Sequence, residues 1–218
     1  MAHVASGTYR PDLRKKKNPS QKRSTDTLNL ILRVAGELLG DVGIERLSTN
    51  LICKRARLTP PALYRYFPNK YAVLKELGVR LMKAQNDAYL EWLKKQRQPV
   101  PAGTPEQVAR RLREIQEITN AVTETFPGAA WIMRALRAVP VLQKVRLESH
   151  HFVADRAFED IRRHYVNATD AQLRLATRLS VEMMYAATEM IFDDPDLDAD
   201  KVNTEVAEMI VRYFQKFS

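Results

Sequence analysis

Apolar residues recur every three or four positions along most of this chain, which is the spacing of amphipathic helices. The first such stripe begins near residue 24, and Gly43, which tolerates a positive φ, follows its end. Two short segments come next, at about 48–56 and 59–67, and a hydroxyl residue stands where each needs an N-cap. Because only a few residues separate the two segments, the pattern predicts a helix-turn-helix unit.

Beyond residue 70 the same periodicity predicts six further helices and no strand. Thr104 and Thr169 each precede a glutamine by three residues, which is the pattern of a capping box at the start of a helix. The expected ranges are about 70–96, 104–125, 128–138, 140–166, 169–192 and 199–216. With the three helices before residue 70, the sequence predicts an all-α fold of about nine helices.

The net positive charge of the chain is confined to its first third. Residues 1–70 contain 14 Lys and Arg against 5 Asp and Glu, whereas residues 71–218 contain 21 of each. Clustered cations of this kind suit a polyanionic partner such as nucleic acid, because they release its condensed counterions. A solubilising basic tail explains the same charge, and charge alone does not decide between the two.

Several classes of function lack their sequence signals. Cys53 is the single cysteine, so we expect no internal disulfide and interpret this residue as a small buried hydrophobe. No glycine-rich phosphate loop, nucleophile elbow or HExxH motif occurs, which argues against an enzyme, a cofactor and a metal site. No apolar run is long enough to span a bilayer and no secretory signal is present, so we expect a cytoplasmic protein without a membrane partner.

Residues 47–70 carry the most specific motif, which ends in the string LYRYFPNK at residues 63–70. Their apolar, capping and aromatic positions together resemble the DNA-binding signature of the TetR family of bacterial regulators, which ends in Leu-Tyr-x-[His/Tyr]-Phe-x-x-Lys. Arg57 departs from the family, which usually has glycine in this turn, and Pro61 and Ala62 replace common small and hydroxyl residues. The resemblance therefore implies DNA binding by this unit but does not carry over a base preference.

In a helix-turn-helix the recognition helix enters the major groove, while the preceding helix crosses the DNA backbone. Arg65 suits bidentate contact with guanine, and a tyrosine hydroxyl more often positions a phosphate. Leu63 and Phe67 are expected in the core, and for Tyr66 we favour DNA contact over a half-buried core position. The predicted DNA-facing residues are Ser48, Thr49, Asn50, Arg57, Thr59, Pro60, Pro61, Ala62, Tyr64, Arg65, Tyr66 and Lys70.

We divide the chain into a basic flexible arm at 1–23, a helix-turn-helix DNA-binding domain at 24–70, and a helical ligand-binding and dimerisation domain at 71–218. The arm lacks apolar periodicity, and its lysines either enter the minor groove of DNA or form a solvated tail.

The resemblance also implies that the larger domain dimerises and encloses a pocket for a small molecule. Helices at about 170–192 and 199–216 have apolar stripes that fit a seam between two subunits, although packing within one subunit explains the stripes as well. Pocket candidates, each with ordinary core packing as its alternative, are Tyr89, Trp92, Phe126, Trp131, Met133, His151, Phe152 and Tyr185.

The resemblance thus implies a homodimeric repressor that binds a palindromic double-stranded DNA operator and is released by a small, largely apolar effector. The alternative is an architectural or protein-interaction DNA-binding factor of the same fold, without an effector. A closed pocket of several hundred Å³ favours the repressor, and a tightly packed core favours the alternative.

Overall fold

The structure, a computed structural model, describes residues 11–16 and 22–218. Within these residues the chain forms nine α-helices, two short 3₁₀ helices and no strand, which confirms the all-α prediction. The α-helices are α1 (Lys22–Arg46), α2 (Thr49–Ala56), α3 (Pro60–Tyr64), α4 (Lys70–Lys95), α5 (Pro105–Thr125), α6 (Ala129–Ala138), α7 (Gln143–Ile161), α8 (Asp170–Asp193) and α9 (Ala199–Phe214). The 3₁₀ helices are η1 (Pro140–Leu142) and η2 (Gln215–Phe217).

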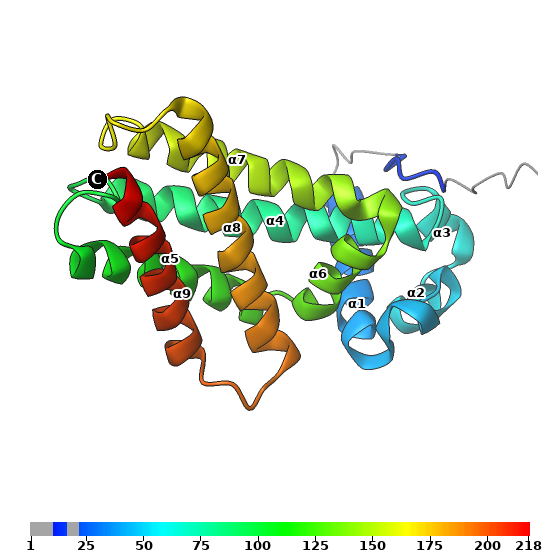
Figure 1. Ribbon diagram of the computed structural model, residues 1–218. Coiled ribbons are helices and arrows are strands. Elements are labelled where there is room, and N and C mark those ends of the chain that lie inside the picture. Colours follow the sequence, from blue (N-terminus) through cyan, green and yellow to red (C-terminus); the bar gives the residue numbers. More distant parts are fainter. Residues whose placement is uncertain (1–10, 17–21) are drawn as a thin grey trace, which may run out of the picture.

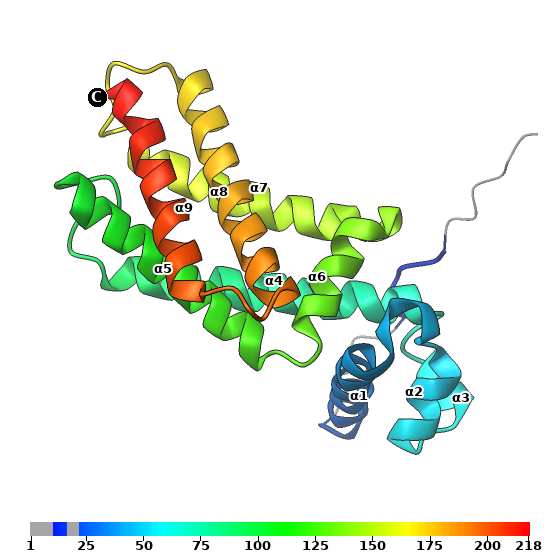
Figure 2. The same ribbon diagram turned by 60° about the horizontal axis from the view of Figure 1, so that its bottom comes forward.

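Helix α4, 26 residues long, connects the two ends of the molecule (Figure 1). At one end α1, α2 and α3 form a compact three-helix unit, and at the other α5, α8 and α9 lie together near the C-terminus (Figure 2). Helix α7 packs against both α4 and α8, and α5 packs against α9. Helix α6 contacts α1, α4 and α7, so it lies at the junction between the three-helix unit and the larger helical domain.

Completely buried apolar side chains hold the three-helix unit together. Ile31 of α1, Ile52 of α2, and Leu63 and Phe67 around α3 each have 0% of their surface exposed. Burying one such side chain stabilises a fold by about 1.5–3 kcal/mol relative to leaving it in water. The prediction that Leu63 and Phe67 belong to the core is therefore confirmed, and Cys53 is likewise buried as a free cysteine.

Two glycines of α1 allow this helix to approach α6 closely. A Cβ atom on Gly36 would lie 2.6 Å from the carbonyl oxygen of Pro127, so a larger residue there would force the two segments apart. Gly43 has φ 73°, a conformation that costs L-residues energy, and the ring of Trp131 lies against it. The predicted break after residue 42 is present as a kink, beyond which α1 continues to Arg46.

Side-chain caps fix the starts of most of the longer helices. Thr104 and Thr169 form the two predicted capping boxes, each with the glutamine three residues later. Asn69 caps α4 and Asp198 caps α9 by accepting hydrogen bonds from backbone N–H groups in the first turn. These caps satisfy donors that a helix start would otherwise leave without partners.

Three helix boundaries differ from the sequence prediction. Helix α1 begins at Lys22, and the hydroxyl of Ser24 bonds that of Tyr66 at 2.9 Å instead of capping the helix. Helix α3 ends at Tyr64 rather than Phe67, and a turn follows in which the N–H groups of Tyr66 and Phe67 both bond the carbonyl of Leu63. Helix α7 ends at Ile161 and not near 166, since the chain turns back after it.

Candidate functional site

The outer face of α2 and α3 is polar and basic. Asn50, Lys54, Arg57 and Arg65 are exposed on it, and so is Tyr64, with 41% of its surface exposed. The remaining predicted positions on this face are Ser48, Thr59, Pro60 and Pro61, all exposed, and Thr49 and Ala62, both half-buried. The buried face of the same two helices is apolar, so the amphipathic pattern turns this cationic and hydroxyl-bearing surface to solvent.

The turn between α2 and α3 has a left-handed residue where glycine is usual. Arg57 has φ 52° and ψ 42°, and within the described chain it is the one residue other than glycine with positive φ. Its N–H bonds the carbonyl of Lys54, and that of Leu58 bonds the carbonyl of Cys53, which closes α2. Arg57 therefore adopts the left-handed backbone that glycine usually provides in this turn, and its side chain is exposed.

Hydrogen bonds fix the relative position of the two helices. Ser48 caps α2 by accepting from the N–H of Leu51 at 3.1 Å, as predicted. The hydroxyls of Thr49, at the start of α2, and Tyr64, at the end of α3, lie 3.1 Å apart. This bond crosses the exposed face, so the phenol of Tyr64 is held at the surface.

Two residues predicted to face DNA are used inside the protein instead. Tyr66 is only 3% exposed, and its hydroxyl bonds Ser24 of α1, so we leave it out of the DNA-facing set. Lys70 directs its ammonium to the carbonyl oxygens of Ile44 and Glu45 at 3.1 and 3.3 Å. Its side chain thereby joins the start of α4 to the end of α1, rather than extending freely to a phosphate.

Part of the predicted flexible arm lies against the three-helix unit. The N–H of Lys16 donates to the carbonyl of Tyr66, and Asn69 donates to the carbonyl of Asp12. Lys15 forms an ion pair of 2.8 Å with Glu76 of α4. Residues 11–16 are thus an ordered strap, which corrects the prediction of a flexible arm for this stretch; residues 1–10 and 17–21 lie outside the described chain.

The sequence prediction missed two cations of α2, Lys54 and Arg55, both exposed. Arg55 pairs with Asp41 of α1 at 3.1 Å, and both side chains are more than half exposed. The available signal was the charge of these two residues in a helix whose buried face is formed by Ile52, Cys53 and Ala56.

Two small cavities lie inside the larger helical domain. The first, of about 30 Å³, is lined by residues of α4, α5, α7 and α8, among them Gln85, Gln116 and Tyr185. The second, of about 90 Å³, is bounded by apolar residues that include Leu112, Ile161 and Phe214. Tyr89, Ile115, Val153, Val181 and Met184 line both cavities, so the two share a wall.

Of the eight predicted pocket residues, only Tyr89 and Tyr185 line these cavities. Phe126, Trp131 and Met133 instead belong to the apolar cluster that joins α1, α4 and α6. Trp92 is half-buried and donates to Glu114, whereas His151 and Phe152 are exposed. Phe152 lines a separate open groove of about 320 Å³ between α4 and α7. None of the six lines the two inner cavities, because helical periodicity does not tell which neighbour a buried face meets.

A polar network on α5, α8 and α4 forms one wall of the first cavity, and the sequence prediction missed it. Gln116 donates to the carbonyl of Met184 at 2.9 Å and to Thr188 at 2.6 Å, and Gln85 donates to Thr123 at 2.8 Å. Gln116, Asn120 and Thr123 stand at i, i+4 and i+7, so a polar stripe inside an amphipathic helix was the available signal.

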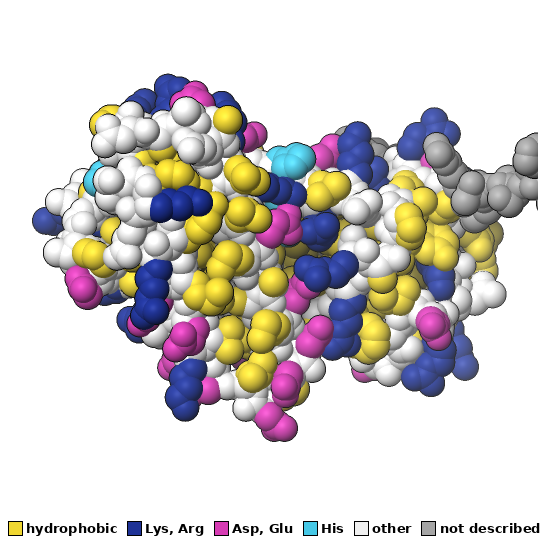
Figure 3. Space-filling model, in the orientation of Figure 1, with side chains coloured by type: hydrophobic (Ala, Val, Ile, Leu, Met, Phe, Trp, Pro, Cys, Tyr) yellow, Lys and Arg dark blue, Asp and Glu magenta, His cyan; other side chains and the backbone are white. Residues whose placement is uncertain are grey.

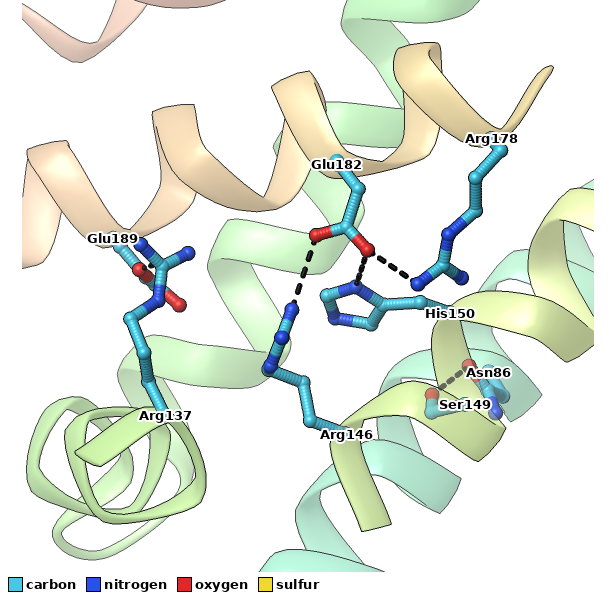
Figure 4. A network of polar contacts seen from close by, with 8 residues as sticks. All are labelled: Asn86, Arg137, Arg146, Ser149, His150, Arg178, Glu182 and Glu189. Carbon is cyan, nitrogen blue, oxygen red and sulfur yellow. Dashed lines mark hydrogen bonds and ion pairs between the residues drawn. The ribbon is translucent and has the colours of Figure 1, made fainter. Parts of the chain in front are cut away.

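A second network joins α7 to α8 (Figure 4). Glu182 accepts from Arg146 and His150 of α7, each at 3.0 Å, and pairs with Arg178 at 2.6 Å. His150 is 1% exposed and stacks on Tyr185 with ring centroids 3.9 Å apart. The imidazole therefore connects this network to the cavity wall.

Burial lowers the pKa of His150 to about 4, although the hydrogen bond with Glu182 acts in the opposite direction. For Glu182, burial alone would raise the pKa, but the hydrogen bond with His150 and the charges of Arg178 and Arg146 bring it below its usual value. Burial also raises the pKa of Tyr185 to about 12. At neutral pH the histidine and the tyrosine are uncharged and the glutamate is ionised.

The outer faces of α8 and α9 expose large apolar side chains. Leu175 is 59% exposed, Leu179 43%, Met190 52% and Met209 55%. Figure 3 shows hydrophobic side chains gathered over this side of the molecule. Contiguous apolar surface of this kind marks interaction sites in soluble proteins.

The part of the chain that the structure describes contains no group of three His, Cys, Asp or Glu residues able to hold a metal ion. None of its helices is long and apolar enough to cross a membrane.

Comparisons with known proteins agree with this geometry. The family model described as "Bacterial regulatory proteins, tetR family" matches residues 31–77, from α1 into α4. The tetracycline repressor protein class C of Escherichia coli is 42% identical over 52 residues, which are 24% of this chain and 24% of that protein. The match thus spans about a quarter of the relative's length.

Two solved structures share the fold over most of the chain. The fatty acid degradation regulator FadR from Bacillus halodurans has a TM-score of 0.68 and 17% identity, covering 90% of this chain and 97% of that one. SmeT, in a complex with triclosan, has a TM-score of 0.62 and 18% identity, covering 86% and 91%. At these identities the likeness shows the fold alone.

The protein is therefore a helix-turn-helix protein with a larger all-helical domain. Its residues 31–77 match the model of the TetR family of bacterial regulatory proteins, and its fold over most of the chain is similar to that of FadR. The description of that model, bacterial regulatory proteins, agrees with the DNA-binding unit predicted from the sequence.

Proposed function

We propose that this protein is a homodimeric transcriptional repressor that binds a palindromic operator through α2 and α3 and is released by a small, largely apolar effector. Residues 24–70 form the DNA-binding domain in this proposal, and residues 71–218 form the ligand-binding and dimerisation domain. The observation that carries the proposal is the exposed basic and hydroxyl face of α2 and α3, backed by the buried Leu63 and Phe67. The charge of the first 70 residues supports it, because the rest of the chain is neutral.

In this proposal α3 lies in the major groove. Arg65 and Tyr64 are exposed at its end, where they meet bases and phosphates, and Arg57 and Thr49 meet the adjacent backbone. Lys54 and Arg55 add phosphate contacts along α2. The pairing of Thr49 with Tyr64 holds the tyrosine ready for contact, so little ordering is needed when DNA binds.

Coupling between effector and DNA runs through α4 and α6. Helix α4 lines the first cavity through Gln85 and Tyr89, and its first residue, Lys70, is bonded to the end of α1. Helix α6 packs against α1 where Gly36 meets Pro127. An effector that favours a different position of α4 changes the spacing of the two helix-turn-helix units in a dimer, which is a shift between two populations.

The dimer uses the exposed apolar faces of α8 and α9, and it brings two helix-turn-helix units to the two halves of a palindrome. Figure 1 shows these helices far from α2 and α3, which leaves the basic faces free. The reported family relatives include a tetracycline repressor and a structure solved with triclosan, which supports repression and small-molecule binding as properties to test here.

The first experiment measures DNA affinity. An operator is selected from a random DNA library with the wild-type protein, and affinities are measured by mobility shift for Arg65→Ala and Tyr64→Ala. Each is expected to lose about 1–3 kcal/mol of binding free energy, since each removes a contact with a base or a phosphate. The matched controls Tyr66→Phe and Lys201→Ala are expected to stay within about twofold, because Tyr66 is buried and Lys201 lies on α9. Unchanged affinity in both Arg65→Ala and Tyr64→Ala would refute the assignment.

The second experiment tests the dimer. A charge on the α8 and α9 face, as in Leu179→Lys combined with Met209→Lys, is expected to give a monomer at micromolar concentration in sedimentation, with unchanged helix content. The control Val166→Lys changes an apolar residue that is 79% exposed but lies in the turn before α8. A wild-type protein that sediments only as a monomer would remove both the dimer and the palindrome.

An architectural DNA-binding factor without an effector is the second candidate. The small size of these two cavities favours it, because drug-sized ligands fill about 300–1,000 Å³. The repressor is favoured instead by a more open pocket of about 220 Å³, which adjoins the second cavity at Leu112, Ile161 and Phe214. Operator binding that no small molecule changes would be the outcome expected of that factor.

A further inference from the structure

Two glutamine oxygens at the first cavity lack a hydrogen-bond partner within the described chain. They are Oε1 of Gln85 on α4 and Oε1 of Gln116 on α5. Both side chains are 2% exposed, and both residues line the cavity. Buried acceptors are nearly always bonded in folded proteins, so two of them at one cavity indicate a missing donor.

The neighbours of each amide show that oxygen, and not nitrogen, is the free atom. Thr123 donates its hydroxyl proton to the carbonyl of Thr119 at 2.7 Å, so it can only accept from the nitrogen of Gln85. Gln116 faces the carbonyl of Met184 at 2.9 Å, and a carbonyl also only accepts. Exchanging the nitrogen and oxygen of either amide would break these bonds, so both amide orientations are fixed.

We propose that the first cavity recognises an uncharged ligand through a hydroxyl or N–H group that donates its proton to Oε1 of Gln85 or of Gln116. This inference rests on the proposed function, because it names the chemistry of the effector. No charged residue lines the first cavity, so a cationic group placed there would be buried without a counter-charge; Asp160 lines only the second cavity. A carboxylate would meet two acceptor oxygens, which disfavours an anionic ligand.

The rest of the ligand is a short apolar tail. The second cavity adjoins the first, with Ile115, Val181 and Met184 lining both, and it is lined mainly by apolar residues such as Leu112 and Phe214. An apolar cavity of about 150 Å³ is known to hold benzene, so the two cavities of about 30 and 90 Å³ suit a ligand of about seven non-hydrogen atoms.

The test compares two isomers that differ in one donor. Calorimetric titration of the full-length protein measures the Kd of 1-hexanol, of methyl pentyl ether and of hexanoate. 1-Hexanol is expected to bind at least about tenfold more tightly than the ether, which has the same atoms but no donor, and hexanoate more weakly than 1-hexanol. Equal affinity for the alcohol and the ether, tighter binding of hexanoate, or no binding of 1-hexanol would overturn the proposal.

Substitution of the two glutamines tests whether they cause the preference for 1-hexanol over the ether. In Gln116→Met the preference for 1-hexanol over the ether is expected to fall, and in the double variant with Gln85→Met it is expected to disappear. The control Gln107→Met changes the exposed capping glutamine of α5 and should keep the wild-type preference. A preference retained in a folded double variant would show that other groups bind the hydroxyl. The comparison of isomers on the wild-type protein decides the proposal even if the double variant does not fold.

Operator affinity is also measured on the same protein without ligand. The failure of the ligand inference can then be distinguished from the failure of the repressor proposal. Operator binding without a preference for the alcohol would refute the inference and leave a DNA-binding regulator. A preference for the alcohol without operator binding would refute the repressor and leave a small-molecule-binding protein.

Discussion

The helix-turn-helix unit and the larger helical domain differ in where they keep their polar groups. In the described part of the unit the buried side chains are apolar, apart from the hydroxyl of Tyr66, and the cations and hydroxyls face solvent. In the larger domain the buried set includes Gln85, Gln116, His150 and Asn203, and every buried polar or charged side chain of the described chain lies at residue 85 or beyond.

This difference in polar groups fits two different tasks, one for the helix-turn-helix unit and one for the larger domain. An apolar, fully packed interior gives the helix-turn-helix unit one stable shape, which suits a surface that must match DNA. The larger domain instead contains cavities and two acceptors without partners, so its packing is incomplete in a way that a ligand can complete. The junction of α1 with α6 and α4 joins a rigid unit to an adjustable one.

The difference in packing is tested most directly by truncating one buried aliphatic side chain to alanine in each region. Leu63→Ala is expected to lower the free energy of unfolding by about 3–5 kcal/mol, because it opens a new cavity at a residue with 0% exposure. Ile115→Ala, at a residue that already borders both cavities, is expected to cost about 2 kcal/mol, since fewer contacts are lost. Urea unfolding followed by circular dichroism measures both, and equal losses would contradict the difference in packing.

The second prediction concerns pH and the polar interior of the larger domain. The pKa of His150 is about 4 in the fold and near 6.5 in the unfolded chain, so the unfolded chain binds the proton first as the pH falls. Stability is therefore lost between pH 6.5 and 4, and about 2 kcal/mol of it should be gone at pH 5 relative to pH 8. The measurement is the free energy of unfolding across this range.

His150→Asn is expected to remove most of that pH dependence, because its amide can donate to Glu182 without titrating. His151→Asn, at the exposed neighbouring position, is the matched control and should keep it. A pH dependence that survives in His150→Asn would show that another group causes it.

The smallest expected effect lies in the turn of the helix-turn-helix unit. Arg57→Gly is expected to stabilise the protein by about 0.5 kcal/mol, because glycine adopts the left-handed backbone without strain. Arg57→Ala keeps the strain and should not stabilise. Both variants remove the same cation and should weaken operator binding equally, so thermal unfolding together with mobility shift separates the backbone from the charge.

Much of the fold was predictable because it depends on local signals. The helix-turn-helix unit, the two capping boxes and the buried Leu63 and Phe67 follow from spacing and from residue types a few positions apart. The exposed basic face of α2 and α3 was also predictable from spacing and residue type, although Lys54 and Arg55 were missed. Its contacts with DNA stay a prediction.

The candidate effector site was poorly predicted because it depends on contacts between distant helices. Six of the eight predicted pocket residues lie elsewhere, and the glutamines that line the cavity come from α4 and α5, 31 positions apart in the sequence. The burial of Tyr66 likewise depends on Ser24, 42 positions earlier, and Lys15 is held by Glu76. No spacing rule within one helix indicates such partners.

The sequence by itself determined which segments become helices, where they start, and which face of α2 and α3 is apolar, because these depend on interactions within a few turns. Only the tertiary structure decided which polar residues are buried together and where space remains between helices. The physical reason is that a cavity is a property of the packing of several helices at once, and a buried acceptor lacks a partner only once all its neighbours are in place.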